Sequence, residues 1–347
     1  DVVSVKDGRN GVLLTNKVGK AQLTLTIDGA KQPNIVKNID VLSSASSLFS
    51  LGDGSEENPY LIFNLGDFNN MANSSADLSK NYRLMADIKD GKNSVLQQIG
   101  TTNKLFSGTF DGYGHSISIT NNEHAASVLN KSNENLGLFA SNSGIIKNLT
   151  IKDRTITFNK FNQSTQFIKN FGLICGSNTG TISGCKVYNC NLSFLSGVEK
   201  YTYKNINMGG IAGFNSGTID NCEVSNCKIY NTAEDQTQAY TDSIKMVYTG
   251  GIAGLNKGGT ISYCSSNKNV IKSIVSENNS SPNYLFIAAA GGIVGASIDN
   301  GKLEFCITHS YSSKDLTFDY QQTIEARSSD DGHYGNAVAG GIAGITS

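Results

Sequence analysis

A glycine-rich unit repeats head to tail through most of this 347-residue chain. Each copy opens with Gly-Gly-Ile-Ala-Gly or a relative of it, continues through Gly-Thr-Ile, and reaches a cysteine three residues after that isoleucine. The copies begin at Gly137, Gly172, Gly209, Gly250, Gly291 and Gly340. Such repetition is typical of solenoids, in which one supersecondary unit stacks on the next. A stacked rod presents surface more readily than it encloses a pocket, so the repeat favours binding over catalysis.

The hydrophobic pattern inside each copy is that of short strands. The isoleucine of Gly-Thr-Ile serves as an anchor, and the anchors are Ile146, Ile182, Ile219, Ile261 and Leu303. Apolar residues recur five positions later in the first three copies, with Ser266 and Thr308 in the last two, and ten positions later in the first four, with Ser313 in the last. The apolar residues follow a period of two and then change parity, which requires a bend. Asn189 and Asn226 fall at this bend, and asparagine tolerates the left-handed conformation.

We therefore expect an all-β protein, a parallel β-helix in which each turn of the coil contains roughly three short strands. Identical turns would stack about 4.8 Å apart, so that like residues lie above one another in interior columns. The paired glycines would remove side chains where two backbones approach closely.

The cysteines share a position in the repeat and form no zinc-type or CxxC spacing. The four at this position are Cys185, Cys222, Cys264 and Cys306. Leu149 occupies it in the first copy. A position that accepts leucine or cysteine behaves as a small buried apolar site, which predicts reduced, stacked thiols. Disulfides between adjacent turns, or a metal, are the alternatives.

The composition narrows the classes of partner. The net charge is −1, so nothing indicates nucleic acid or an anionic membrane surface as a partner. No run approaches the roughly 18–20 apolar residues of a transmembrane helix, and we expect no membrane insertion of this segment. The 37 glycines and 3 prolines suit many tight turns between short strands.

The first turn of the coil would expose an apolar interior and an open strand edge unless a cap covers them. Residues 64–73 are the candidate, because Leu65, Phe68, Met71 and Ala72 share one helical face. We divide the coil into a cap with first turns, residues 50–125, and repeats, residues 126–347.

Three segments carry a family resemblance: Gly52–Ile62, Tyr82–Ile117 and the repeat series itself. Together they cover about residues 51–347, and in that order they resemble the GLUG-repeat family of bacterial cell-surface, adhesin-like proteins. The resemblance implies a right-handed parallel β-helix, a secreted or surface-anchored location, and no shared catalytic residues.

Residues 1–49 differ from the repeats. Their alternating strand pattern, as in Gly19–Ile27, is similar to the last strands of a bacterial immunoglobulin-like domain. A sandwich of that kind needs about 100 residues, so we interpret this segment as part of a domain. The chain stops inside a repeat, which suggests truncation at that end too.

The acidic and histidine residues that are candidates for catalysis or metal binding are Asp53, Glu56, Glu57, Asp111, His115, Asp330, Asp331 and His333. We interpret Asp111 and His115 as an architectural turn, Asp53 to Glu57 as another turn, and the C-terminal group as a solvated loop. None has the Asp-x-Asp-x-Asp-Gly calcium pattern, and no nucleophile-elbow, zinc-protease or phosphate-loop motif occurs. We therefore predict no catalytic or metal residues, no cofactor and no enzyme activity.

The most suggestive feature is a set of insertions near residues 195–208, 232–248, 274–289 and 314–338, which should leave the coil at one corner. Their tyrosines are the predicted binding residues: Tyr201, Tyr203, Tyr240, Tyr248, Tyr284, Tyr320 and Tyr334. Tyrosine offers a flat apolar ring with a polar tip, and loops on one side of a repeat array often bind. The plainer alternative is that these rings pack their own loops against the coil.

The resulting prediction is a non-enzymatic, adhesin-like binding protein, extracellular or on the bacterial cell surface, whose partner is a host surface protein or a glycan. A carbohydrate-active β-helix enzyme and a structural stalk are the alternatives, because β-helices also host polysaccharide lyases and hydrolases.

Overall fold

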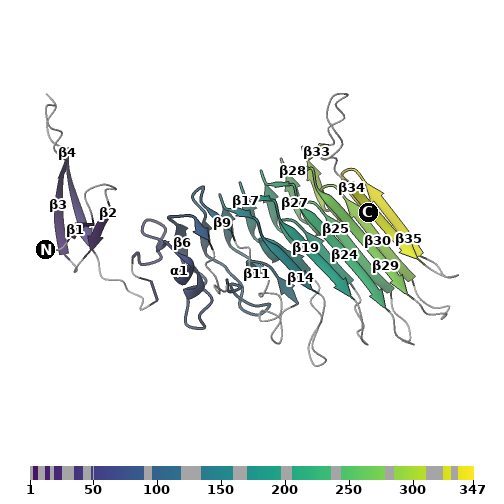
Figure 1. Ribbon diagram of the computed structural model, residues 1–347, viewed down its shortest axis with the longest axis horizontal. Coiled ribbons are helices and arrows are strands. Elements are labelled where there is room, and N and C mark those ends of the chain that lie inside the picture. The colour runs from purple at the N-terminus through teal and green to yellow at the C-terminus, as the bar shows by residue number, and fades with distance from the viewer. Residues whose placement is uncertain are drawn as a thin grey trace.

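The computed structural model describes residues 48–347 except 50, 90–95, 119–133, 159–169, 197–204, 236–243, 278–284, 310–322 and 330–334, and four strands before residue 48. Among the described residues every regular element except one short helix is a β-strand, and from β5 onward parallel strands stack along one axis (Figure 1). This confirms the predicted β-solenoid.

One full turn of the coil crosses five sheets, which are named here in the order in which the chain meets them. The first contains β10 (Asn135–Leu136), β15 (Asn170–Gly172), β20 (Asn205–Gly209), β25 (Ile244–Gly250), β30 (Leu285–Gly291) and β35 (Gly335–Gly340). The second contains β11 (Phe139–Asn142), β16 (Cys175–Asn178), β21 (Ala212–Asn215), β26 (Ala253–Lys257), β31 (Val294–Ile298) and β36 (Ala343–Thr346).

The third sheet contains β5 (Tyr60–Ile62), β6 (Asn81–Leu84), β8 (Thr109–Asp111), β12 (Ile145–Lys147), β17 (Thr181–Ser183), β22 (Thr218–Asp220), β27 (Thr260–Ser262) and β32 (Lys302–Glu304). The fourth contains β7 (Ile88–Lys89), β9 (Ser116–Ser118), β13 (Thr150–Lys152), β18 (Lys186–Tyr188), β23 (Glu223–Ser225), β28 (Ser265–Asn267) and β33 (Ile307–His309). The fifth contains β14 (Thr155–Phe158), β19 (Asn191–Ser196), β24 (Lys228–Asp235), β29 (Val270–Glu277) and β34 (Thr323–Ser329).

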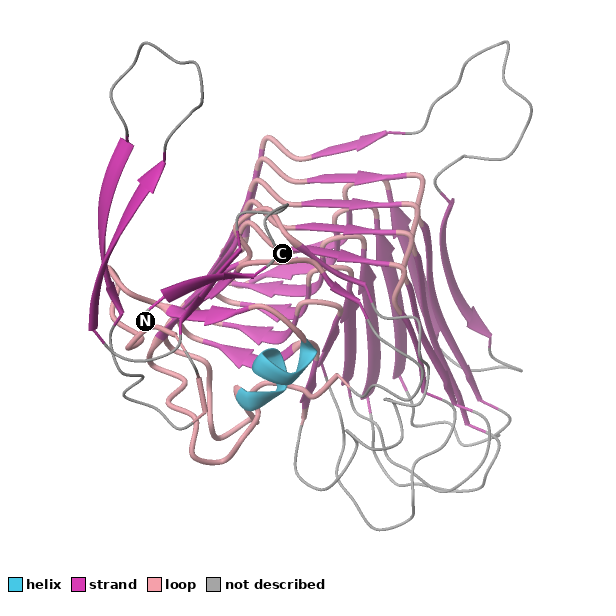
Figure 2. Cartoon of the chain, turned by 60° about the vertical axis from the view of Figure 1, so that its left-hand side comes forward, coloured by secondary structure: helices cyan, strands magenta, loops and turns pink. Residues whose placement is uncertain are grey.

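Five strands in each full turn, where about three were expected, is a correction (Figure 2). The strands of the first sheet end at or just before the first glycine of the glycine-rich phrase, and those of the second sheet lie inside the phrase, where apolar and polar residues do not alternate. A sequence without alternation gives no period-two signal, so the phrase is easily taken for a turn.

The predicted anchor column is confirmed. Ile182 pairs with Ile146 on one side and with Ile219 on the other, and the series continues through Ile261 to Leu303. The four isoleucines are fully buried, and Leu303, in the last turn, is partly buried. Each buried aliphatic side chain of this size contributes about 1.5–3 kcal/mol, so the column is a main source of stability.

The second predicted column, ten positions after the anchor, is correct for four turns and wrong for the last. Leu192, Ile229 and Ile271 are paired and buried as expected. In the last turn, however, Ile324 of β34 pairs with Ile271. Ser313 lies outside the described residues. The chain therefore reaches the fifth sheet later in this turn than simple counting predicts.

Two corners of the coil depend on left-handed backbone. Between the fourth and fifth sheets, Asn189 and Asn226 have φ of 56° and 53°, which confirms the predicted bend. The corner between the third and fourth sheets has positive φ at Asn148, Gly184, Asn221, Tyr263 and Phe305. Asparagine and glycine are the residues that adopt this conformation most readily.

The paired glycines allow successive turns to approach closely. A Cβ atom on Gly210 would collide with the carbonyl oxygen of Gly251 and with the side chain of Val224. The same clash recurs one turn later, where a Cβ on Gly251 would meet the carbonyl oxygen of Gly292. Space excludes a side chain at these glycines, as the sequence predicted.

Inside the coil, a ladder of asparagine amides runs along the second sheet. The Nδ2 groups of Asn142, Asn178 and Asn215 each donate to the Oδ1 of the next asparagine at 2.8 Å, and Asn256 donates to Ser297 Oγ at 3.2 Å. All four asparagines are fully buried. Because a buried amide without partners is costly, the ladder fixes the register between turns.

All seven cysteines are free, and six are buried. This confirms the predicted apolar column, in which Leu149 precedes Cys185, Cys222 and Cys264. Cys222 donates to the carbonyl of Ile182 at 3.8 Å in the turn before it. Hydrogen bonding with the neighbouring thiols of Cys185 and Cys264, together with burial, raises the pKa of Cys222, so this thiol is neutral in the folded protein.

The N-terminal end of the coil is closed differently from the expected helical cap, which is not seen. Helix α1 (Leu65–Asn70) begins at its N-cap Asn64 and buries Phe68. It follows β5 within the first turn, and six residues span only about 9 Å, too little to cover five sheets. The outer edge of β5 meets the preceding segment instead: Leu61 N–H donates to the carbonyl of Leu51 at 3.1 Å.

Before the coil, the described strands form two antiparallel pairs. Strand β1 (Val3–Lys6) pairs with β2 (Val12–Thr15), and β3 (Gly19–Leu25) pairs with β4 (Ile35–Val41). These pairs contain the strands expected for the N-terminal segment.

Candidate functional site

Of the seven predicted binding tyrosines, only Tyr248 lies among the described residues. The other six lie outside them: Tyr201, Tyr203, Tyr240, Tyr284, Tyr320 and Tyr334. Tyr248 belongs to β25 rather than to a loop, and it is 7% exposed. Its ring packs with Ala289 and Ala296, and burial raises its hydroxyl pKa. Tyr248 is therefore a packing residue, which corrects the prediction for this position.

The insertions are shorter than the sequence suggested because strands extend into them. Strands β24 and β29 of the fifth sheet run for eight residues each, and β25 and β30 of the first sheet for seven each. Ser273 Oγ in β29 donates to the carbonyl of Val247 in β25 at 2.7 Å. The extended strands thus join the two sheets at one edge of the coil, and each remaining insertion connects them there.

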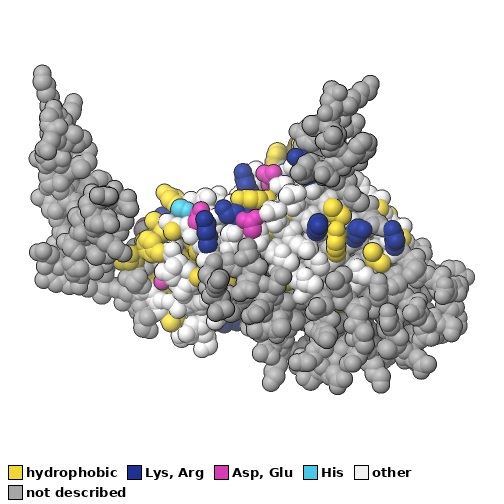
Figure 3. Space-filling model, in the orientation of Figure 1, with side chains coloured by type: hydrophobic (Ala, Val, Ile, Leu, Met, Phe, Trp, Pro, Cys, Tyr) yellow, Lys and Arg dark blue, Asp and Glu magenta, His cyan; other side chains and the backbone are white. Residues whose placement is uncertain are grey.

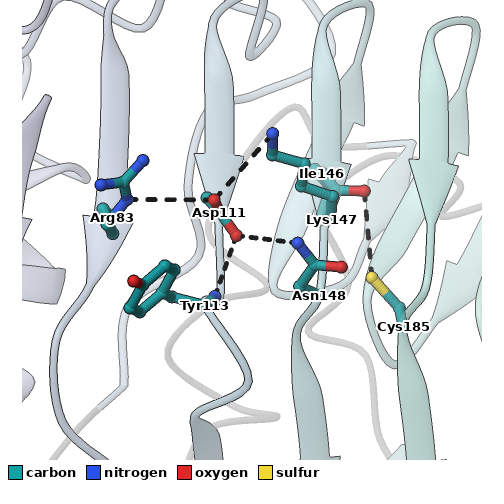
Figure 4. A network of polar contacts seen from close by, with 7 residues as sticks. All are labelled: Arg83, Asp111, Tyr113, Ile146, Lys147, Asn148 and Cys185. Atoms are coloured by element: carbon teal, nitrogen blue, oxygen red, sulfur yellow. Dashed lines mark hydrogen bonds and ion pairs between the residues drawn. The ribbon is translucent and has the colours of Figure 1, made fainter. Parts of the chain in front are cut away.

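Asp111 is a buried carboxylate of the coil, and neighbouring residues contact both of its oxygens (Figure 4). Oδ1 accepts from the Tyr113 amide at 2.9 Å and from Asn148 Nδ2 at 3.1 Å. Oδ2 lies 3.9 Å from both Arg83 Nε and Lys147 Nζ. The cluster links three adjacent turns and leaves no oxygen directed at a substrate, which agrees with an architectural role.

His115 follows the Asp111 turn but faces a different carboxylate. Its Nδ1 lies 3.5 Å from Asp87 Oδ1, and Asp87 also accepts from the Ser116 amide at 2.8 Å. That hydrogen bond lowers the pKa of Asp87, so the group is ionised at neutral pH and unsuited to act as a general acid.

The remaining candidates for catalysis or metal binding form no common site among the described residues. Asp53 closes a turn by accepting from the Ser55 amide at 2.8 Å, and hydrogen bonds from the Ser55 side chain and amide lower the pKa of Asp53. Asp330, Asp331 and His333 lie outside the described residues. Within the described part of the chain, no group of three His, Cys, Asp or Glu side chains could hold a metal ion. Figure 3 shows charged side chains in small separate groups on the visible face.

Sequence reasoning missed a buried arginine. Arg154 is 8% exposed and donates from Nη1 to the carbonyl of Leu173 at 3.1 Å. Desolvation lowers its pKa to about 10. It occupies the position that Cys190 and Cys227 hold in the next two turns, and the Arg154 amide donates to Cys190 Sγ at 3.5 Å.

The second missed feature is a pair of aromatic rings on the outer surface. Tyr263 and Phe305 stack at the corner between the third and fourth sheets, and both have positive φ. A signal existed in the sequence, because both residues stand two positions after an anchor, where Asn221 stands in the preceding turn.

Comparison with known proteins gives sparse matches, and no family model matches the chain. Over 144 residues, which cover 38% of this chain, it is 28% identical to halomucin of Haloquadratum walsbyi. The match spans only 1% of halomucin's length. A solved Bacteroides ovatus structure, provisionally assigned as an immunoglobulin A1 protease, has 19% identity and a TM-score of 0.44, covering 85% of this chain and 87% of that one. Neither match assigns a function to this chain.

Helices are scarce throughout the described residues. No helix in this part of the chain is long and apolar enough to cross a membrane.

Proposed function

We propose that this chain is a secreted or cell-surface β-solenoid that binds a host surface protein or a glycan without catalysis. The binding surface is the set of loops that connect the fifth sheet to the first. In this function the coil is a rigid support, and the loops supply the contacts.

One observation carries the proposal: the long segments recur at the same connection in successive turns. They separate β14 from β15, β19 from β20, β24 from β25, and β29 from β30. By contrast, β20 and β21 are joined by two residues, as are β21 and β22. Since the sheets are parallel and in register, loops at one connection leave one edge of the rod, and repeat proteins commonly bind there.

The charged residues support binding rather than catalysis. Hydrolysis of a glycan needs a pair of carboxylates on either side of one bond. Among the described residues, Asp111 is neutralised by Arg83 and Lys147, and Asp87 is paired with His115. Each of these carboxylates is committed to a structural contact.

The family and the finer architecture belong to the same proposal. The coil is a GLUG-type repeat with a right-handed sense, as parallel crossovers almost always have. The N-terminal strands are part of an immunoglobulin-like domain. Both features suit an adhesin-like protein on a bacterial surface.

The test combines a binding screen with a turnover assay on the full chain. We expect retention on a glycan array or on a panel of host surface proteins, and no release of reducing ends from polysaccharides. Tyr203→Ser and Tyr240→Ser should each weaken the binding found at least tenfold. Tyr188→Ser is the matched control, because Tyr188 is 38% exposed on the fourth sheet, away from these loops.

Each contrary outcome has a clear reading. Turnover of a polysaccharide would replace the proposal with an enzyme, and silence in both screens would replace it with a stalk. If the loop variants bind as well as the parent protein, the loops are not the binding surface.

A further inference from the structure

The corner between the third and fourth sheets changes character along the coil. After the turn of β8 and β9, where the left-handed residues are Tyr113 and Gly114, its left-handed positions in successive turns are Asn148, Gly184, Asn221, Tyr263 and Phe305. The first three carry a short side chain or none, and the last two carry large rings. Tyr263 is 59% exposed and Phe305 is 72% exposed, although each covers one face of the other. Their rings lie 4.9 Å apart at 11°, and β28 and β33, which follow this corner, lie side by side (Figure 1).

Folding alone gives no reason for rings at this corner. The backbone has φ of 51° at Tyr263 and 53° at Phe305, a region that bulky residues rarely occupy. Asn221 adopts φ of 50° at the equivalent position, so asparagine satisfies the same geometry. Large rings held exposed on an unfavourable backbone are the kind of outlier that occurs at functional sites.

The residues beside the rings indicate what they contact. The strand ends that lead into this corner carry Asp220, Ser262 and Glu304 in register, and Ser262 Oγ donates to Asp220 Oδ1 at 2.6 Å. Glu304 is exposed, and Glu223 starts the strand after Asn221. Carboxylates and hydroxyls of this kind accept hydrogen bonds from hydroxyl groups, and they repel phosphates and other anions.

We propose that the Tyr263–Phe305 stack, with the carboxylates of Asp220 and Glu304 beside it, is a binding site for the neutral pyranose rings of a glycan. A pyranose presents C–H groups on its flat side and hydroxyls around its rim. The face of an aromatic ring is negative and attracts such C–H groups, while the carboxylates accept from the hydroxyls. Only the short side chain of Asn221 stands at this corner in the preceding turn, so the Tyr263 face directed that way is open to a sugar ring.

This site goes beyond the loop surface proposed above. The loops connect the fifth sheet to the first, whereas the rings lie between the third and fourth sheets. The coil thereby carries a second contact of its own, and the two surfaces can be tested separately.

The experiment measures binding of the full chain to an array of neutral and acidic glycans, followed by titration with the best retained oligosaccharide. We expect retention of neutral glycans. Tyr263→Asn and Phe305→Asn should each weaken that binding at least tenfold with an unchanged or higher Tm, because Asn221 shows that asparagine fits the corner. Tyr188→Ser on the fourth sheet, outside both proposed surfaces, should leave the neutral-glycan affinity within twofold.

The proposal is overturned if only acidic glycans or none are retained, or if both asparagine variants bind neutral glycans as the parent does. It is also overturned if the Tyr263→Asn and Phe305→Asn variants lose a protein partner while their glycan affinity stays constant. Loss of neutral-glycan binding in Tyr203→Ser alone would assign the sugar to the loops, leaving the loop proposal intact and this one wrong.

Discussion

The first turns of the coil, residues 60–118, and the repeat turns, residues 170–309, fill their interiors in different ways. In the first turns, phenylalanine rings from different positions of the chain meet edge to face: Phe68 and Phe110 lie 6.0 Å apart at 82°, and Phe110 lies 5.4 Å from Phe139 of the next turn at 65°. In the repeat turns, equivalent positions stack on one another, and several columns repeat one residue type, as in the isoleucine, cysteine and asparagine columns. The closed end is thus filled by rings that meet edge to face, whereas the repeat turns place equivalent positions above one another.

Truncating a ring at the closed end should have the largest effect. Phe110→Ala removes a fully buried ring that contacts both Phe68 and Phe139, and we expect a loss of about 3–5 kcal/mol in the free energy of unfolding. Urea denaturation measures this loss. Phe110→Leu, which keeps most of the volume, should lose much less. Equal small losses in both variants would show that interlocking rings do not hold this end.

Breaking the amide ladder should have the next largest effect. Asn215→Ala removes the acceptor for Asn178 and the donor to Asn256 within a fully buried column, so we expect a loss of about 2–3 kcal/mol. Asn215→Ser is the matched variant, because Ser297 occupies this position two turns later, and it should lose less. A loss in the free energy of unfolding no greater than that for a surface asparagine would show that the stacked amides of successive turns contribute little to stability.

The pH dependence of the free energy of unfolding tests the burial of one thiol, that of Cys175. Burial raises the pKa of Cys175 to about 12 from the ordinary value of 9.0. The folded state therefore holds its proton more tightly than the unfolded state. This contribution is complete below pH 9 and is lost as the pH rises from 9 toward 12, by up to about 1.4 kcal/mol per pH unit.

Cys175→Ala should flatten that alkaline decline and cost only about 1–1.5 kcal/mol at pH 7, because Ala212 fills the same position in the next turn. Chemical denaturation at pH 7, 9 and 10.5 measures both effects. An unchanged slope above pH 9 would contradict the burial of a neutral thiol.

The corners should give the smallest effect. Asn226→Ala places a Cβ without a compensating amide at φ of 53°, and we expect a loss of about 0.5–1 kcal/mol in thermal unfolding. Asn226→Gly should be close to neutral because glycine adopts this conformation freely. A stable alanine variant would indicate that these corners tolerate any residue, and would weaken the contrast between constrained repeats and irregular ends.

The sequence predicted the features that are visible when one copy of the repeat is compared with the next. The anchor isoleucines, the Leu149-to-Cys306 column and the bends at Asn189 and Asn226 all repeat at one position, so their burial or backbone conformation could be anticipated. Equivalent residues of successive copies are in contact, so the repeat in a single sequence already indicates these long-range contacts.

Features that break the repeat were predicted less well. The hydrophobic face of residues 64–73 correctly indicated that Phe68 is buried, but not that the helix lies inside the first turn. Counting from the anchors could not locate Ile324, because extra residues precede β34. Tyr248 was assigned to a loop because nothing in its sequence marks how far β25 extends. The aromatic corner needed a residue-by-residue comparison of the turns.

The buried amide ladder also restricts how such a rod can change in length during evolution. Asn178, Asn215 and Asn256 occupy equivalent places, so excising one complete coil from Asn178 to just before Asn215 would rejoin equal partners and leave every remaining amide bonded. Excising half a coil would leave buried amides without hydrogen-bond partners. Duplication and loss of complete units is therefore the tolerated route, and related rods should differ by whole numbers of coils.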